Sequence, residues 1–369
     1  MKICHLSSVH PAGDIRIFEK ECKSLAAHGY EVVLIIKNKE AETREGIKII
    51  PFPVLKNRLL RVFLSPFRMF FLARRQEARV YHFHDPELII TGLLLRFFTK
   101  AAVVYDIHED YKTSIRQKYY LPGIISYPLA GLFGLFEALA ARFFHILLAE
   151  KYYSQRFPRG IQVLNYPLPR PLTPGALPGP VSPGPARLIY TGTVSGSRGA
   201  YVHARLLTLV KDCEIYFIGS CRTEEADKIR EIVGDQKDRL FLEGENQFVL
   251  PARIRHYYET GRWLAGLAVF PNSGHYRQKE LTKFFEYMAA GIPIICSDFP
   301  VWRELVEANG VGLAVNPSEP DALVEAVEFL KTHPEKAAEM GERGKQLTQD
   351  RFNWQNEEKK LLELYERIK

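Results

Sequence analysis

Lys283 and Glu286 lie three residues apart in LTKFFEYMAAGIPIICSD, residues 281–298, whose apolar spacing predicts an amphipathic helix that ends at Gly291. A cation at the start of a helix can bind a phosphate, because the free backbone N–H groups there attract anions. A carboxylate one turn later can accept hydrogen bonds from two neighbouring hydroxyls, such as those of a ribose 2′,3′-diol. A surface ion pair is the alternative, but both sides of this helix are apolar.

A second cation follows a predicted strand in YTGTVSGSRGA, residues 190–200. Gly192 and the later glycines leave the backbone bare, and Arg198 offers a planar fork of N–H donors just before a predicted helix. Arg198 and Lys283 are therefore two cations that each lie near a helix start. Such a pair predicts a diphosphate ligand.

Histidines and carboxylates follow two strands in the first half of the chain. One interpretation is a metal site whose ligands are His84, Asp85, His108 and Glu109. Metal ligation requires these side chains to converge from separate loops, which spacing alone does not establish. We therefore expect no metal and interpret His108 as a neutral hydrogen-bonding group in the crevice, with helix capping as the alternative.

Gly13 lies in the turn between the first predicted strand and the first helix. A residue without a Cβ lets the backbone approach an anion, and the following helix directs N–H groups towards it. An ordinary tight turn is the alternative. The turn contains neither G-x-G-x-x-G nor G-x-x-x-x-G-K-[ST], which argues against a dinucleotide fingerprint and a P-loop.

Strand-like and helical runs alternate along the chain and predict an α/β fold with doubly wound parallel sheets. The alternation stops over residues 167–186, where eight prolines predict a linker. We predict one Rossmann-like domain over 1–166, a second over 187–350, and a helix over 351–369 that crosses back to the first. The two domains should face each other across a cleft, since such sheets bind ligands beyond the carboxyl ends of their strands.

Basic charge is concentrated in residues 1–180, which hold 25 Lys and Arg against 15 Asp and Glu. Residues 56–79 interleave basic and large apolar side chains, and residues 121–150 are apolar and almost uncharged. This pattern suits an anionic lipid surface, whereas two core helices with solvated arginines are the alternative. The candidate acceptor-binding or membrane-binding residues are Arg58, Arg61, Arg74 and Arg75. No nucleic-acid-binding motif accompanies the charge.

Five scattered cysteines in apolar segments predict buried thiols of a reducing compartment rather than disulfides or a zinc finger. The start, MKICHLSS, is typical of a strand rather than a signal peptide, and no uninterrupted apolar span of about 18 residues occurs. We therefore expect a cytoplasmic protein that can rest on the inner face of a membrane.

The chain resembles retaining glycosyltransferases of family four, within glycosyl transferases group 1, over nearly its whole length. The resemblance rests on HPAGDIRIFEKECKSLAAHGYEVVLI, YDIHED, VLNYP, YTGTVSGSRG, KFFEYMAAGIPII and FNW. It implies the GT-B fold, with a nucleotide-diphosphate sugar mainly on the second domain and an acceptor on the first. It also implies catalysis without a metal or other cofactor, in which fixed cations and helix N-termini stabilise the departing diphosphate.

The resemblance assigns donor-binding roles to Gly13, Gly192, Arg198, Gln278, Leu281, Thr282, Lys283 and Glu286, and catalytic roles to His108, Arg198 and Lys283. Gln278 departs from the family, which usually has a glutamate there, and Thr193 stands where an arginine is common. A neutral amide stabilises developing positive charge on the sugar less well than a carboxylate does. Backbone N–H groups of residues 279–282 and Lys283 are then expected to contribute more, or the subgroup uses a neutral contact.

The predicted function is transfer of a sugar, with retention, from a nucleotide-diphosphate sugar to a saccharide or lipid-linked acceptor in cell-surface polysaccharide synthesis. UDP is favoured over GDP as the nucleotide. One alternative is a nucleotide-sugar 2-epimerase of the same fold, which would convert the donor without an acceptor. Another is a non-catalytic nucleotide-sugar-binding protein, which would bind the donor without hydrolysis or transfer.

Overall fold

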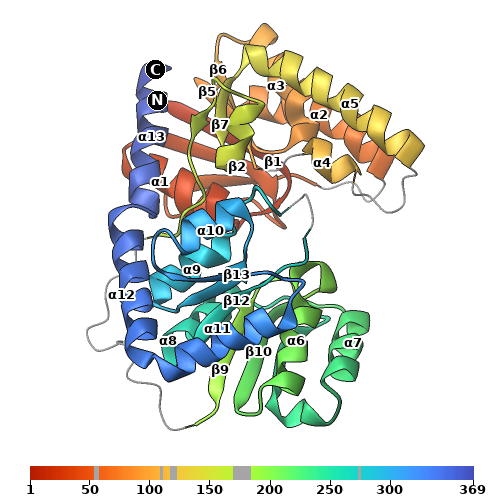
Figure 1. The fold of residues 1–369 in the computed structure, drawn as a ribbon. Coiled ribbons are helices and arrows are strands. Elements are labelled where there is room, and N and C mark those ends of the chain that lie inside the picture. Colours follow the sequence, from red (N-terminus) through yellow and green to blue (C-terminus); the bar gives the residue numbers. More distant parts are fainter. Residues whose placement is uncertain (54–57, 109–110, 117–122, 169–183, 273–275) are drawn as a thin grey trace. The chain divides into compact units, whose positions relative to one another are not determined.

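The computed structural model describes residues 1–53, 58–108, 111–116, 123–168, 184–272 and 276–369. The chain forms two compact units (Figure 1). Unit 1 comprises Met1–Leu168 together with Trp354–Lys369, and unit 2 comprises Pro169–Asn353. Most of the predicted linker, residues 169–183, lies outside the described residues.

Unit 1 contains an eight-stranded sheet of order β3-β4-β2-β1-β5-β6-β7-β8, in which only the β3–β4 pair is antiparallel. The strands are β1 (Lys2–Pro11), β2 (Glu31–Lys37), β3 (Glu42–Arg44), β4 (Ile47–Pro51), β5 (Val80–Phe83), β6 (Ala102–Ile107), β7 (His145–Leu148) and β8 (Ile161–Gln162). The strand order reverses between β1 and β5, so the loops after these strands diverge and leave room for side chains between them.

The helices of unit 1 follow the strands in alternation. They are α1 (Lys23–Ala27), α2 (Arg58–Arg74), α3 (Ile89–Phe98), α4 (Tyr111–Arg116), α5 (Gly123–Ala140) and α13 (Trp354–Arg367), with the short segments η2 (Pro86–Leu88), η3 (Ala141–Phe143) and η4 (Lys151–Gln155). The helix expected after β1 begins as a π-helical segment, η1 (Ile15–Cys22), before continuing as α1. Asp14 caps its start, because Oδ1 accepts hydrogen bonds from the backbone N–H groups of Arg16 and Ile17.

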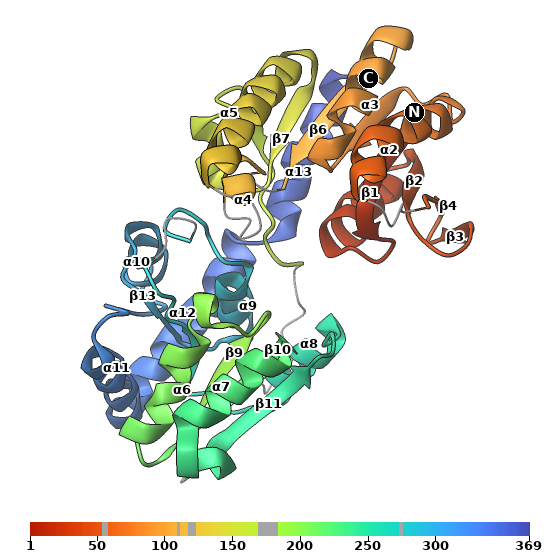
Figure 2. The same cartoon turned by 90° about the vertical axis from the view of Figure 1, so that its right-hand side faces the viewer.

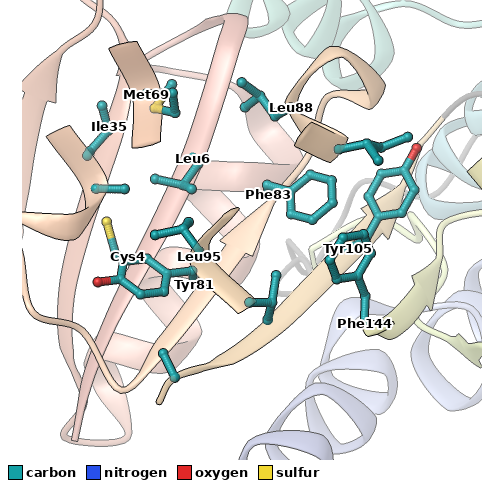
Figure 3. Close-up of a cluster of buried hydrophobic side chains, with 14 of the residues drawn as sticks. Cys4, Leu6, Ile35, Met69, Tyr81, Phe83, Leu88, Leu95, Tyr105 and Phe144 are labelled. Carbon is teal, nitrogen blue, oxygen red and sulfur yellow. The ribbon is translucent and has the colours of Figure 1, made fainter. Parts of the chain in front are cut away.

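Alternate residues of the central strands pack into two different apolar clusters, as the two-residue period of a strand requires. Cys4 and Leu6 of β1 join Tyr81 and Phe83 of β5 in one cluster (Figure 3). Ile3 of β1 and Val80 of β5 point to the other face and belong to a second cluster, which includes Trp354 of α13. The C-terminal helix therefore supplies part of the core of unit 1, and Figure 2 shows it running along this sheet.

Unit 2 contains a six-stranded parallel sheet of order β11-β10-β9-β12-β13-β14. The strands are β9 (Ala186–Thr191), β10 (Cys213–Cys221), β11 (Leu240–Glu245), β12 (Ala265–Ala268), β13 (Ile294–Ser297) and β14 (Gly312–Val315). The helical elements are η5 (Gly196–Arg198), α6 (Ala200–Leu209), α7 (Thr223–Val233), η6 (Gly234–Arg239), α8 (Pro251–Thr260), α9 (Thr282–Ala290), α10 (Pro300–Val306), α11 (Pro320–Thr332) and α12 (Pro334–Asp350). The strand order reverses between β9 and β12, so the loops after these strands can form a binding site.

Residues 281–298, for which the sequence predicted a helix followed by a strand, form α9 and β13. Gly291 ends α9 in the left-handed conformation, with φ 70°, which a residue without a Cβ adopts at little cost. The backbone N–H of Ile292 then donates to the carbonyl of Tyr287 at 2.9 Å, which closes the last turn. The N-terminal end of α9 receives no side-chain cap, so its first N–H groups remain available.

One helical stretch, Ile124–Phe143, is long and apolar enough to cross a membrane by length and composition. We expected no uninterrupted apolar span of about 18 residues; the stretch found here is apolar overall but includes the charged residues Glu137 and Arg142. Glu137 is buried, accepts from the Tyr105 hydroxyl at 2.8 Å and pairs with Arg156 at 2.6 Å. These contacts attach α5 to the sheet of unit 1 through one of its faces.

Candidate functional site

Lys283 in the first turn of α9 has a buried ammonium group. Its Nζ lies 3.4 Å from the ring centroid of Tyr190 and 5.2 Å from that of Phe270. Among the described residues it has no hydrogen-bond partner. Burial, together with the neighbouring charge of Arg198, holds the pKa of Lys283 well below its ordinary value. A buried donor of this kind would gain from an anion that bonds to it.

Arg198 lies at the end of η5, immediately before α6. The turn is fixed by Gly199, which has φ 82° and whose added Cβ would lie 1.9 Å from the carbonyl oxygen of Val269. The Nε of Arg198 donates to the Tyr276 hydroxyl at 3.2 Å, and the Tyr276 ring packs edge-on against Phe270. Since the ammonium of Lys283 also contacts Phe270, the structure brings the two predicted cations to the same part of unit 2.

Glu286 is half-buried one turn after Lys283. Its Oε2 accepts from the Tyr258 hydroxyl at 3.0 Å, and this hydroxyl also contacts Oγ1 of Thr191 at 2.6 Å. Burial, followed by the nearby charge of Glu286, raises the pKa of Tyr258 well above its ordinary value. No ion pair joins Glu286 to Lys283 in this described region, so the surface-pair alternative does not account for the two residues.

The segment before α9 is held by backbone contacts. The indole Nε1 of Trp302 donates to the carbonyl of Lys279 at 2.6 Å. Gln278 is exposed, Leu281 is the N-cap residue and Thr282 opens the helix. The predicted donor-binding residues of this segment therefore surround an uncapped helix N-terminus.

Gly192 follows β9 with φ 95° and donates its N–H to the carbonyl of Ile218 at 3.0 Å. The backbones are so close here that a Cβ at Gly219 would lie 1.9 Å from the carbonyl oxygen of Gly192. The loop after β9 is therefore tightly packed against the end of β10. Gly192 also follows Thr191, whose hydroxyl contacts Tyr258, the residue that bonds to Glu286.

Gly13 and His108 lie in unit 1, whereas the other predicted donor-binding and catalytic residues lie in unit 2. An added Cβ at Gly13 would meet nothing within 4 Å, so its backbone is open to approach. Nε2 of His108 contacts the carboxylate of Asp106, Nε of Arg16 at 3.2 Å and Nδ1 of His84 at 3.2 Å. His108 is therefore positioned by a buried polar network.

Of the four residues considered from sequence as metal ligands, His84 and His108 come together with Asp106 in a group that could hold a metal ion. Asp85 accepts from Ser7 Oγ at 2.8 Å and from the Ser8 backbone N–H at 2.6 Å. Hydrogen bonds from His10 and these serines outweigh burial and lower the pKa of Asp85 to about 2. Glu109 lies outside the described residues.

The four predicted arginines belong to α2 or follow it. Arg74 and Arg75 are exposed at its C-terminal end, and the side chains of Arg58 and Arg61 lie outside the described residues. Sequence reasoning missed the tyrosines that position the unit 2 site, Tyr190, Tyr258 and Tyr276. Tyrosine is common in both cores and clefts, so no local signal separates these three from the others.

One segment of unit 2 matches a known protein family. Residues 282–347, which begin at α9, match the family described as Glycosyl transferases group 1. The chain is 29% identical over 122 residues to spore coat protein SA of Bacillus subtilis, and this match covers 33% of the chain and 31% of that protein's length.

Solved structures match the whole chain. Sucrose-phosphate synthase from Thermosynechococcus elongatus has a TM-score of 0.77 and 15% identity, with 100% of this chain and 98% of that one covered. HepE from Anabaena, in complex with UDP-glucose, has a TM-score of 0.71 and 12% identity, with 100% of both chains covered.

The fold is the GT-B fold of two Rossmann-like domains, which confirms the predicted fold class. The resemblance to glycosyl transferases group 1 is likewise confirmed, through the segment that contains Lys283 and Glu286.

Proposed function

We propose that the protein is a retaining glycosyltransferase of family four that takes a sugar from a nucleotide-diphosphate donor. The observation that carries this proposal is the ammonium of Lys283, which is buried without a hydrogen-bond partner in the described structure, at an uncapped helix N-terminus and near Arg198. A buried cation of this kind suits an anion with several acceptor oxygens, and a diphosphate has them.

The proposed role of Arg198 and Lys283 is to stabilise the leaving diphosphate. Negative charge grows on the diphosphate as its bond to the sugar breaks, and fixed donors in a partly dry site act strongly on such charge. The acceptor hydroxyl attacks from the face of the leaving group and passes its proton to the departing phosphate oxygen. This step requires no protein nucleophile and no metal.

Glu286 is proposed to hold the ribose. The Tyr258 hydroxyl occupies one side of the carboxylate at 3.0 Å, which fixes the orientation of the carboxylate while leaving acceptor capacity for a diol. The proposed nucleotide is UDP, and the similar fold of HepE in complex with UDP-glucose supports this choice. Gln278 is proposed to give the sugar a neutral contact beside the backbone N–H groups at the start of α9.

A donor panel tests the proposal. UDP, GDP, ADP and their sugars are compared by thermal shift, and the donor that stabilises most is then incubated with and without a membrane-derived acceptor fraction. Glu286→Gln should weaken binding of the preferred nucleotide about tenfold, because the ribose hydroxyls lose their hydrogen bonds to a charged group. The matched control is Glu325→Gln, an exposed glutamate of α11.

Three results would contradict the transferase. No stabilisation by any nucleotide sugar removes the donor site. Conversion of the donor to its 2-epimer without an acceptor supports the epimerase. Tight binding without transfer or hydrolysis supports a non-catalytic binding protein.

The acceptor is proposed to be a saccharide or lipid-linked molecule reached from an anionic membrane surface, in cell-surface polysaccharide synthesis. Exposed large apolar side chains lie on three helices of unit 1, including Phe63 and Phe67 of α2, Phe97 and Phe98 of α3, and Ile124, Leu132 and Leu135 of α5. Helix α3 contacts both α2 and α5, so these side chains belong to neighbouring elements. Exposed cations such as Arg68, Arg74 and Arg96 accompany them and suit anionic headgroups.

A further inference from the structure

Three histidines and one glutamate converge in the interior of unit 1. His5 comes from β1, His82 and the adjoining His84 come from the end of β5, and Glu21 comes from η1. The β1–β5 register places His5 directly beside His82, and the two-residue period places His84 on the same face. Glu21 and the side chain of each histidine are fully buried.

Oε2 of Glu21 is the centre of this cluster. It lies 3.9 Å from Nδ1 of His5, 3.8 Å from Nε2 of His82 and 4.0 Å from Nε2 of His84. The other carboxylate oxygen, Oε1, faces Nε of Arg16 at 3.1 Å. One oxygen is thus directed at the guanidinium, and the other at three ring nitrogens.

The cluster is poorly satisfied by hydrogen bonds. In the described part of the chain, neither Oε2 of Glu21 nor Nε2 of His82, which lie 3.8 Å apart, makes a hydrogen bond within the usual distance. Most buried polar atoms of folded proteins are paired, because an unpaired one costs about 1–3 kcal/mol. Two such atoms that face each other, with Nδ1 of His5 and Nε2 of His84 beside them, indicate that a partner belongs between these four atoms.

We propose that His5, Glu21, His82 and His84 bind a divalent transition metal ion of the Zn²⁺ type. Four ligand atoms about 2.0–2.1 Å from a tetrahedral Zn²⁺ lie about 3.3–3.4 Å apart. Nδ1 of His5 lies 3.0 Å from Nε2 of His84, and the ligand atoms of the four residues all lie within 4.8 Å of one another, so side-chain movements would close the cluster around the ion. Imidazole nitrogens and one carboxylate favour zinc over Mg²⁺ or Ca²⁺, which prefer oxygen ligands.

Residues around the cluster support ligation by these histidines. The outer nitrogen of His82, Nδ1, contacts the Tyr365 hydroxyl of α13 at 2.8 Å. The outer nitrogen of His84, Nδ1, lies 3.4 Å from Oδ2 of Asp106. A metal-bound histidine commonly gives its other ring N–H to a carboxylate or hydroxyl, which fixes the ring and raises its basicity.

The proposed role of the ion is structural. Four protein ligands and full burial leave no open coordination position, so the ion takes no part in the proposed sugar transfer. It connects β1, β5 and η1 directly, and it connects α13 through Tyr365. Because the site is closed, the metal is expected to enter during folding and to stabilise the folded state of unit 1.

The test measures zinc in the full chain by elemental mass spectrometry after expression in zinc-supplemented medium and gel filtration. We expect about one zinc per chain, less than a fifth of this in His82→Gln, and an unchanged amount in His203→Gln. His203 is the matched control because it is an equally buried histidine, in unit 2, that accepts from the Val269 N–H. Circular dichroism confirms that each variant is folded.

A second measurement uses the unaltered protein and does not depend on how the variants fold. Protein refolded with a chelator should unfold at least 10 °C lower than protein refolded with zinc, and Mg²⁺ should not restore the difference. The proposal is overturned if the purified chain contains no zinc or similar ion and its unfolding temperature is the same under both refolding conditions. That outcome would mean that protons, rather than a metal, satisfy the cluster.

Discussion

At the residue scale, the candidate donor site consists of charges placed against aromatic rings. Lys283 contacts the faces of Tyr190 and Phe270, and Arg198 bonds to Tyr276, which packs on Phe270. Aromatic faces attract cations but provide fewer compensating contacts than water does. The site therefore keeps its cations in place while leaving donors for a ligand.

Lys283→Met should raise the stability of the folded protein and weaken its binding of the donor nucleotide. Because folding lowers the pKa of Lys283, the unfolded chain binds its proton more tightly, and the free energy of unfolding rises with pH towards the ordinary lysine pKa of about 10.4. Methionine has no charge to bury, so the variant should be about 1–2 kcal/mol more stable at neutral pH. Its free energy of unfolding should also depend less on pH. Its affinity for the donor nucleotide should fall at least tenfold.

Urea unfolding at pH 7 and pH 9.5 measures the stability, and calorimetry measures the affinity. Lys211→Met serves as a control, since Lys211 is exposed in the same unit. A Lys283→Met variant that is less stable than the parent, with unchanged nucleotide affinity, would show that the ammonium has a structural role instead.

At the element scale, α2 and α5 combine contacts inside unit 1 with exposed apolar faces. The Thr91 hydroxyl of α3 donates to the carbonyl of Pro66 inside α2 at 2.8 Å, and Glu137 joins α5 to Arg156. A helix that crossed the bilayer would have to give up such contacts. These contacts are compatible with the proposed membrane association only if the helices lie on the membrane surface rather than span it.

Replacing Arg58, Arg61, Arg74 and Arg75 by Gln should weaken binding to anionic vesicles more than tenfold, since each basic residue near such a surface contributes about 1 kcal/mol. Vesicle sedimentation at two salt concentrations measures the effect, which should shrink at high salt. The control has the same change in charge on unit 2, at the exposed positions Arg205, Lys211, Arg222 and Arg255. Equal loss in both variants would mean that only net charge matters.

At the scale of the whole molecule, the end of the chain completes the core of its beginning. Trp354 is buried in the second apolar cluster of unit 1, and its indole Nε1 donates to Oγ of Ser24 at 2.9 Å. Tyr365 reaches His82 across the same face. Unit 1 therefore depends on residues separated from it in sequence by the whole of unit 2.

Trp354→Ala should destabilise unit 1 by about 3–5 kcal/mol, the usual cost of removing a buried tryptophan. Hydrogen exchange should show lost protection in β1 and β2 while the strands of unit 2 and nucleotide binding are retained. Trp302→Ala, which removes a fully buried tryptophan of unit 2, should reduce protection in the strands of unit 2 and weaken nucleotide binding, while β1 and β2 keep their protection. Loss of protection throughout the chain from either change would mean that the two units unfold together.

The sequence by itself determined the alternation of strands and helices, the doubly wound α/β class, and Lys283 and Glu286 as a pair, whereas the GT-B fold was implied by the family resemblance. These features are recorded locally, in apolar periodicity, glycine turns and the spacing along one helix. Only the tertiary structure decided that Tyr258 orients Glu286, that Arg16 and Asp106 contact His108, and that His5 and Glu21 join His82 and His84. These groups come from elements far apart in the chain. They meet only because the fold places those elements side by side, so no local sequence pattern predicts the contacts between them.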